Sequence, residues 1–317
     1  MDISDIREAK ARISSYVKRT PLERSQTLSR RLATNVFVKY ELFQRTGSFK
    51  ARGAFNKILN LDEDTRRRGV VAVSGGNHAQ AVAYAASILG VQAVIVMPES
   101  TPQNYVDATR AYGAKVALQP TIAAAFESIA DYQAKGMSFI HPFDDPLVMA
   151  GQGTLGLEIV EDLPEVTDVI LSIGGGGLAS GLATALKDAN DSIRVWGVET
   201  EGADAMSQAL EANYPVQLEA ITSIAKTLGA PSVSETTLAL AQSLLQNVTV
   251  VSDAEAVDAL IFIAERLKVI TEPAASCTLA AAERLKDNFD RDSNVVLILC
   301  GGNQSVRDLC GYLSVGK

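Results

Sequence analysis

Histidine and cysteine are scarce in this chain, with two His and three Cys among 317 residues. A histidine-based zinc site or a Ser-His-Asp triad would have to use His78 or His141, so metal-dependent and triad hydrolysis are not expected. The cysteines, Cys277, Cys300 and Cys310, have neither a metal-ligand spacing nor the even number of a disulfide framework. A reducing cytoplasm is therefore the expected location.

Long apolar runs and clustered positive charge are also missing. Runs such as 93–97 and 295–300 are far shorter than the ~20 residues that cross a bilayer, and residues 1–7 are unlike a signal peptide. The 29 Lys and Arg residues against 37 Asp and Glu give a formal charge of -8, and the basic triplet 66–68 is isolated, as at a solvated helix end. Binding to a membrane or to nucleic acid is therefore not expected.

Regular secondary structure is plentiful instead. With 47% hydrophobic and 21% charged residues, the composition is that of an ordinary globular protein, and the length suggests about two domains. Short apolar strands are expected at 70–73, 93–97, 116–118, 168–173, 193–198 and 295–299. Longer amphipathic helices are expected at 3–16, 78–89, 102–112, 123–135, 178–188 and 203–212. This alternation predicts parallel sheets with helical crossovers.

The two series of strands and helices are separated by residues 139–146. This segment contains two prolines and an acidic pair, which break any regular element, so the crossing between domains is placed there. The predicted fold is α/β with two domains, each an open twisted, mainly parallel sheet flanked by helices. Residues 1–50 and 146–317 are assigned to a large domain and residues 51–145 to a small one.

Three glycine-rich turns follow strands, at 74–77, 174–177 and 300–303. Loops at the carboxyl ends of strands build the ligand site in open α/β sheets. In the second turn, four glycines between a strand and a helix leave backbone amides free to point at one anion, with help from the helix dipole. Because a tight turn needs only one or two glycines and each extra one costs backbone entropy, this turn predicts a phosphate site.

The same turn also fits a dinucleotide-binding fingerprint. Gly174, Gly176 and Ala179 have the G-x-G-x-x-A spacing, and Glu199 ends the next strand as a ribose partner. A nicotinamide-dependent oxidoreductase is therefore an alternative. A separate small-residue turn, 47–53, delivers Lys50, and lysine is the residue that forms Schiff bases, although a single lysine is usually a surface charge.

Taken together, six ordered motifs closely resemble the serine/threonine dehydratase and serine racemase family of fold-type II pyridoxal phosphate enzymes. They are 47–54 (GSFKARGA), 74–80 (SGGNHAQ), 141–146 (HPFDDP) with 150–154 (AGQGT), 174–178 (GGGGL), 271–273 (TEP) and 300–303 (CGGN). The resemblance implies a tryptophan synthase beta-subunit-like fold, pyridoxal 5'-phosphate bound in the cleft between the domains, a small-molecule amino acid substrate and a homodimer.

The resemblance also assigns roles to residues. Lys50 would hold the cofactor as a Schiff base and move the substrate's Cα proton, Phe49 would pack beside the cofactor ring, and Cys300 would face its pyridine nitrogen. Asn77 would hydrogen-bond the phenolic oxygen. The phosphate would be cradled by Gly174, Gly175, Gly176, Gly177 and Leu178. The substrate carboxylate would be bound by Ser74, Gly75, Gly76, Asn77 and His78.

The implied activity is α,β-elimination from a β-hydroxy amino acid such as L-threonine or L-serine, giving a 2-oxo acid and ammonia. Alternative substrates are 3-hydroxyaspartate, phenylserine or a hydroxyectoine-derived amino acid, and a binding protein that kept the fold is a further alternative. A serine racemase is disfavoured, because Gly75 stands where racemases carry a second acid/base serine. Members of the family usually carry an Ala-Asp-Gly tripeptide that lines the substrate site. Here Lys226 and Thr227 stand in place of the aspartate and the glycine.

Metal-binding members of the family have a glutamate, a backbone carbonyl and an aspartate at positions that map to Glu199, Ala203 and Ala205. The aspartate is absent here, so no divalent cation site is expected, and Glu199 is then available to cap the following helix.

Overall fold

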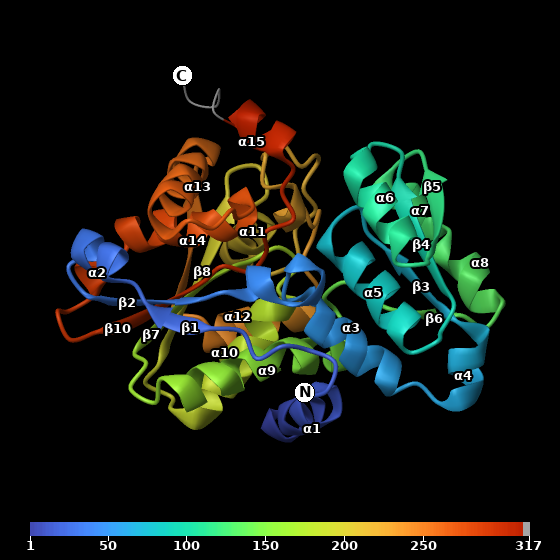
Figure 1. The fold of residues 1–317 in the computed structure, drawn as a ribbon, viewed down its shortest axis with the longest axis horizontal. Coiled ribbons are helices and arrows are strands. Elements are labelled where there is room, and N and C mark those ends of the chain that lie inside the picture. The colour runs from blue at the N-terminus through green and yellow to red at the C-terminus, as the bar shows by residue number, and fades with distance from the viewer. Residues whose placement is uncertain (313–317) are drawn as a thin grey trace.

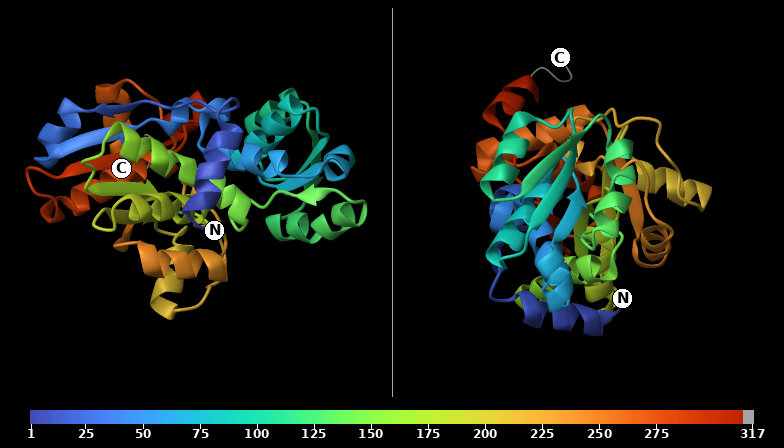
Figure 2. Two further views of the ribbon diagram at one scale, coloured as in Figure 1. Left: turned by 90° about the horizontal axis from the view of Figure 1, so that it is seen from below. Right: turned by 90° about the vertical axis from the view of Figure 1, so that its right-hand side faces the viewer.

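The computed structural model describes residues 1–312, which form two α/β lobes that lie side by side (Figures 1 and 2). The larger lobe contains a six-stranded sheet in the order β1-β2-β10-β7-β8-β9, and the smaller a four-stranded sheet in the order β5-β4-β3-β6. The strands of the large sheet are β1 (Leu22–Arg24), β2 (Asn35–Lys39), β7 (Asp168–Ser172), β8 (Arg194–Thr200), β9 (Asn247–Val251) and β10 (Asn294–Ile298). The strands of the small sheet are β3 (Val70–Val73), β4 (Ala93–Pro98), β5 (Lys115–Gln119) and β6 (Ser138–Phe139).

Both sheets are mainly parallel, as expected, and β1 is the one strand of the described residues that pairs antiparallel, with β2. The helices of the first half are α1 (Ile3–Ile13), α2 (Gln26–Leu32), α3 (Lys50–Leu59), α4 (Glu63–Arg68), α5 (Asn77–Ile88), α6 (Gln103–Ala111), α7 (Ile122–Glu127) and α8 (Ile129–Ala134). Those of the second half are α9 (Pro146–Asp162), α10 (Gly177–Ala189), α11 (Ala205–Ala212), α12 (Glu235–Leu244), α13 (Asp253–Leu267), α14 (Pro273–Arg284) and α15 (Val306–Tyr312).

Helices cover both faces of each sheet, so successive strand residues enter different cores. In β7, Val169 and Leu171 pack with α9 and α10, whereas Ile170 packs with α13 and α14. In β3, Val70 and Val71 likewise belong to the two cores on opposite faces of the small sheet. This explains why these strands are continuous apolar runs rather than alternating patterns.

Helix α9 packs between α3 and α10 through glycine contacts. A Cβ on Gly151 would lie 2.6 Å from the Cα of Gly53 in α3, and a Cβ on Gly153 would lie 2.8 Å from the carbonyl oxygen of Gly181 in α10. The three helices can approach this closely only because these positions lack side chains.

The expected strands and helices are present, with differences at their ends. The N-terminal helix ends at Ile13 rather than at residue 16, and the helix expected over 123–135 is two short helices, α7 and α8, separated at Ser128, whose hydroxyl donates to the Ala125 carbonyl. The expectation that 139–146 is irregular throughout was wrong at both ends. Phe139 ends β6, and Pro146 occupies the first turn of α9, where its missing N–H is tolerated.

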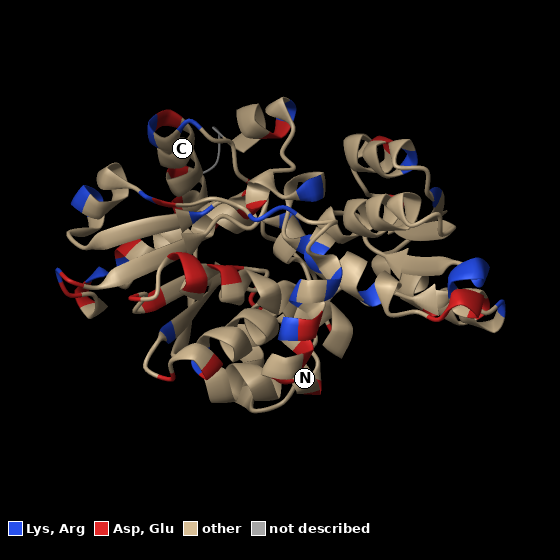
Figure 3. Ribbon diagram, turned by 60° about the horizontal axis from the view of Figure 1, so that its bottom comes forward, with Lys and Arg blue, Asp and Glu red and all other residues tan. Residues whose placement is uncertain are grey.

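Charged residues of both signs are interspersed over the elements (Figure 3). The basic triplet 66–68 forms the last turn of α4, after an acidic first turn, which is the arrangement that the helix dipole favours. Within residues 1–312, no helix combines the length and the apolar character that crossing a membrane requires.

Candidate active site

Lys50 carries the side-chain amine of the candidate site, and the pKa of this amine is strongly lowered. Its Nζ donates to the carbonyl oxygen of Pro142 at 2.7 Å and lies 5.2 Å from the centroid of the Phe49 ring. Burial lowers the pKa of this amine to about 8 from its usual 10.5, because the charged form loses its hydration. A larger fraction of the amine is therefore neutral, and a neutral amine can attack a carbonyl carbon or take a proton.

The turn before Lys50 is fixed by the turn at 300–303, which comes from near the other end of the sequence. The Phe49 N–H donates to the Cys300 carbonyl at 3.1 Å, and the Gly302 N–H donates to the Gly47 carbonyl at 3.0 Å. Gly47 has φ +72°, and a Cβ there would lie 2.5 Å from the Asn303 side chain. Only glycine satisfies both requirements, so two of the sequence motifs form one local structure.

Cys300 lies beside this turn as a neutral thiol. Its Sγ is 3.3 Å from the Ser172 hydroxyl, and burial raises the pKa of the thiol to about 12. At neutral pH the side chain therefore carries no charge.

The glycine turn 174–177 joins β7 to α10. Gly176 has φ +92° and no side chain among the described residues caps the helix, so the first amides of α10 have no partner within it. Both features suit an anion at this helix N-terminus.

Packing also requires glycine in this turn, which the sequence did not indicate. A Cβ on Gly175 would lie 2.1 Å from the Phe143 ring, one on Gly177 would lie 2.9 Å from Phe143, and one on Gly174 would lie 3.0 Å from the Leu228 carbonyl oxygen. Phe143 and Leu228 thus cover the turn.

Asn77, the first residue of α5, is held by the buried carboxylate of Glu272. The Asn77 amide nitrogen donates to both Glu272 oxygens, at 2.9 and 3.1 Å, and its amide oxygen accepts from the Asn303 side chain at 2.7 Å. The Glu272 carboxylate also accepts from the Thr227 hydroxyl at 2.6 Å and from the Asn303 N–H at 2.9 Å. Sequence reasoning included Glu272 in the 271–273 motif but gave it no role, because its partners are distant in sequence.

The other residues of the 74–78 turn lie just before the start of α5 or in its first turn. Ser74 Oγ accepts from the Gly76 N–H at 3.1 Å, and α5 has no side-chain cap. The His78 ring Nε2 contacts the Ile140 carbonyl at 2.8 Å, and burial lowers the pKa of the ring to about 3. A neutral His78 that donates to a carbonyl links α5 to the segment after β6, which is a structural contact.

Glu199 is engaged by the helix that follows it. Its two oxygens accept the N–H groups of Met206 and Ser207 at 2.9 and 2.8 Å, in the first turn of α11. Burial raises the pKa of this carboxyl to about 7. Glu199 is 0% exposed and is held by α11, so it is not accessible to a ribose hydroxyl and the dinucleotide interpretation lacks its ribose partner.

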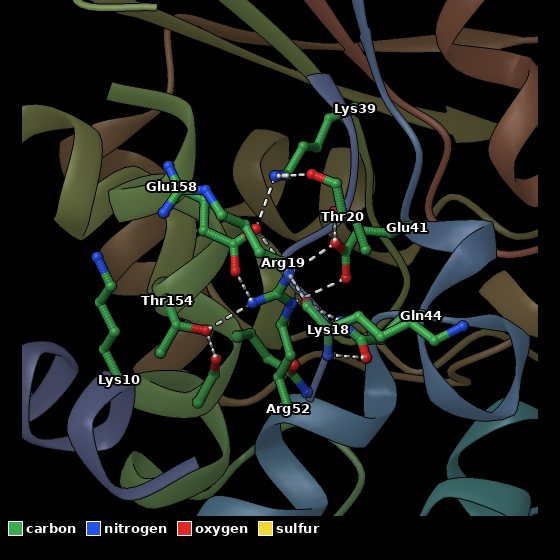
Figure 4. A network of polar contacts seen from close by, with 12 residues as sticks. Lys10, Lys18, Arg19, Thr20, Lys39, Glu41, Gln44, Arg52, Thr154 and Glu158 are labelled. Carbon is green, nitrogen blue, oxygen red and sulfur yellow. Dashed lines mark hydrogen bonds and ion pairs between the residues drawn. The ribbon is translucent and has the colours of Figure 1, made fainter. Parts of the chain in front are cut away.

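A buried ionic network anchors the first turn of α3 (Figure 4). The Arg52 guanidinium pairs with Glu41 at 2.8 and 2.9 Å and with Glu158 at 2.7 and 3.0 Å, and it donates to the Thr154 hydroxyl at 3.1 Å. The Lys39 ammonium pairs with the same Glu158 carboxylate at 2.6 Å. Because Arg52 lies two residues after Lys50, the network fixes the helix end that presents Lys50.

Comparisons with known proteins agree with these features. A family model described as "Pyridoxal-phosphate dependent enzyme" matches residues 13–301. The L-threonine ammonia-lyase of Thermotoga maritima is 40% identical over 316 residues, which cover 99% of this chain and 78% of that protein. The catabolic L-threonine dehydratase TdcB of Staphylococcus aureus is 40% identical over 100% of this chain and 93% of its own length.

Solved structures of similar proteins have the same fold. Maize serine racemase superposes with a TM-score of 0.93 at 37% identity, covering 98% of this chain and 96% of that chain. The processed form of threonine deaminase isoform 2 from Solanum lycopersicum superposes with a TM-score of 0.94 at 33% identity, covering 99% of this chain and 88% of that chain.

Proposed function

Because the chain belongs to the pyridoxal-phosphate dependent enzyme family, we propose that it is a dehydratase that converts L-threonine or L-serine to a 2-oxo acid and ammonia. The observation that carries the substrate class is the 40% identity, over essentially the whole chain, to enzymes that are named for threonine ammonia-lyase and threonine dehydratase activity. The partly buried Lys50, with its lowered pKa, supports a lyase rather than a binding protein.

The residues present fit pyridoxal phosphate. The uncapped glycine turn before α10 suits its phosphate, the buried Lys50 amine suits its carbonyl carbon, and the neutral Cys300 thiol suits a ring nitrogen without a charged partner. When bound, the cofactor supplies an electron sink for negative charge at the substrate Cα. In this proposal Phe49 lies beside the ring, Asn77 faces the phenolic oxygen, and the amides of Gly174, Gly175, Gly176, Gly177 and Leu178 bind the phosphate.

Lys50 is proposed as the base that removes the Cα proton. The neutral amine accepts the proton at Nζ, and the β-hydroxyl leaves as water, so that the proton removed from Cα balances the proton that the leaving hydroxyl takes up. The resulting enamine is hydrolysed to the 2-oxo acid and ammonia. Efficiency as a base requires a pKa near the working pH, and the lowered pKa of Lys50 meets that requirement.

The substrate carboxylate is proposed to bind at the N-terminus of α5. Of the expected amides, that of Ser74 already donates to the Val96 carbonyl at 3.1 Å and that of Gly76 to the Ser74 hydroxyl. The amides of Gly75, Asn77 and His78 are therefore the ones proposed to bind the carboxylate from the small lobe, and the cofactor is proposed to lie in the cleft between this lobe and the large one. We place the domains at 1–50 with 146–317 and at 51–145, and propose a homodimer.

Gly75 offers no hydroxyl for a second acid/base, so elimination is favoured over racemisation.

The experiment that tests the function is a substrate panel scored by release of 2-oxo acid. The enzyme, loaded with pyridoxal phosphate, is given L-threonine, L-serine, 3-hydroxyaspartate and phenylserine. The highest kcat/KM is expected for L-threonine or L-serine. Faster turnover of one of the modified amino acids would reassign the substrate, and no 2-oxo acid from any of them would refute the lyase. Two-way interconversion of L- and D-serine in the same samples would refute the inference from Gly75.

The pKa of Lys50 predicts how fast the apoenzyme takes up its cofactor. Only the neutral amine reacts with an aldehyde, so the rate should rise with pH and reach half its plateau near the pKa of about 8. An unperturbed lysine, with a pKa of ~10.4, would still accelerate about tenfold per unit across this range. The rate of absorbance change after mixing with pyridoxal phosphate, between about pH 6.5 and 9.5, measures this. Nα-acetyl-lysine, which keeps a free ε-amine with an ordinary pKa, is the control. A rate for the apoenzyme that rises with pH in parallel with the rate for this control would contradict the prediction.

A further inference from the structure

Thr101 carries a buried hydroxyl that has no partner among the described residues. It lies in the loop between β4 and α6, where its N–H donates to the Pro98 carbonyl at 2.9 Å and fixes the turn. Its Oγ1 is buried and makes no hydrogen bond within residues 1–312. Buried polar atoms are nearly always hydrogen-bonded, so an unpartnered hydroxyl that borders a candidate binding site is a candidate contact for the bound molecule.

The hydroxyl of Thr101 borders the turn that begins α5. A Cβ built on Gly75 would lie 2.6 Å from Thr101 Oγ1 and 3.4 Å from its Cγ2. β3 and β4 are parallel neighbours, so the loops that follow them meet at one edge of the sheet. The Thr101 hydroxyl therefore lies against Gly75, too close for a side chain at that position.

An anion at this turn would complete the hydrogen bonding of both elements. The 12-residue helix α5 has no side-chain cap, so its first amides have no partner within the helix. The dipole of α5 favours negative charge at the same point, and a threonine hydroxyl can donate to a carboxylate. The amino acid of the proposed reaction carries one carboxylate.

We propose that the Thr101 hydroxyl donates a hydrogen bond to the substrate carboxylate at the N-terminus of α5. This inference rests on the proposed function, since it takes the ligand to be an α-amino acid. Thr101 is then a substrate-binding residue from the loop between β4 and α6, in addition to the 74–78 turn. Its contact is to the carboxylate that all α-amino acids share and not to the β-substituent.

The test compares Thr101→Val, which keeps the shape and removes the hydroxyl, with Thr101→Ser, which keeps the hydroxyl. Thr109→Val is the matched control, because Thr109 is fully buried in α6 of the same lobe and its Oγ1 also has no partner in the described part of the chain. Two quantities are measured on the cofactor-loaded enzyme. One is the KM for L-threonine, and the other is the dissociation constant of L-alanine from its effect on the cofactor absorbance.

For Thr101→Val we expect both quantities to rise about tenfold, the effect of one hydrogen bond to a charged group, with little change in kcat. Thr101→Ser and Thr109→Val should stay within about twofold of wild type. A higher KM for threonine with unchanged alanine affinity would overturn the proposal, because the contact would then be to the β-substituent. Unchanged values for both ligands would also overturn it.

Failure of this inference can be separated from failure of the proposed function. Alanine has no β-hydroxyl to eliminate, so its binding does not depend on lyase activity. Weaker alanine binding by Thr101→Val would support the inference even if the wild-type enzyme released no 2-oxo acid. A wild-type enzyme that bound no α-amino acid would overturn both.

Discussion

Replacing Lys50 by alanine is expected to lower kcat for L-threonine by at least about 10³-fold, since positioned acid–base groups contribute about 10²–10⁴-fold and covalent cofactor attachment is lost as well. The physical reason is that, within residues 1–312, Lys50 supplies the amine at this partly buried position, at the start of α3 beside Phe49 and Pro142. Steady-state release of 2-oxo acid measures the effect. Borohydride reduction followed by peptide mass mapping should add the cofactor mass to Lys50 in the wild type only.

Lys57→Ala is the matched control for this experiment. Lys57 lies on the same helix, where its ammonium pairs with Asp145 at 2.6 Å, far along α3 from the candidate site. We expect its kcat to stay within about twofold of wild type, because its partner Asp145 is given no contact with cofactor or substrate and caps α9 through its own hydrogen bonds. Retention of more than a tenth of the wild-type kcat by Lys50→Ala would remove Lys50 from its proposed role.

Replacing Arg52 by methionine should destabilise the protein by about 3–5 kcal/mol, the usual effect of removing one partner from a buried ion pair. Arg52 is 0% exposed, and its loss leaves the buried carboxylates of Glu41 and Glu158 without their guanidinium. Methionine keeps much of the side-chain volume, so the effect is mainly electrostatic. Urea unfolding followed by the fluorescence of Trp196, the one tryptophan of the chain, measures the free energy of unfolding.

The control for Arg52 is an exposed pair, Arg67 with Asp64, whose side chains are 68% and 71% exposed. Arg67→Met should change the free energy of unfolding by less than about 0.5 kcal/mol, because water screens the pair. A loss in Arg52→Met no larger than this would contradict the buried-network argument.

The pH dependence of Arg52→Met supplies a second check. Burial tends to raise the pKa of Glu158, but Arg52 and Lys39 outweigh burial and hold the pKa below its usual value. Without Arg52 this pKa rises, so the folded variant takes up a proton as the pH falls. The deficit in stability should therefore be smaller at pH 5 than at pH 8.

The sequence predicted the alternating elements well because both sheets have apolar strands and amphipathic helices. It gave no bounds for the helices α2, α3, α4, α9 and α12 to α15. It also missed β1, β2, β6 and β9, which have between two and five residues and lie at or next to sheet edges. Short, partly exposed strands lack the continuous apolar pattern that marks buried parallel strands. Periodicity therefore identified the centre of each sheet better than its margins.

The candidate site was predictable where one segment carries the whole signal. Four consecutive glycines predicted an anion turn from local backbone arguments, and the structure places them at an uncapped helix start. Lys50 alone looked like a surface charge, since its burial depends on Pro142 and Cys300 from other parts of the chain. Glu272, Phe143 and Thr101 could not be ranked from the sequence for the same reason.

The glycine contacts of α9 have a mechanical consequence for the cofactor. α3 and α10 both lie close against α9, at Gly151 and Gly153. The apolar side chains of α3, such as Ala54 and Phe55, lie in the core of the small lobe, together with strand β3 and helix α5. The helix that presents Lys50 is therefore held by both lobes, whereas the phosphate turn before α10 belongs to the large lobe alone. A rotation of the small lobe would have to turn α3 against α9 at the Gly53–Gly151 contact, so this contact couples the position of the lysine to the position of the small lobe.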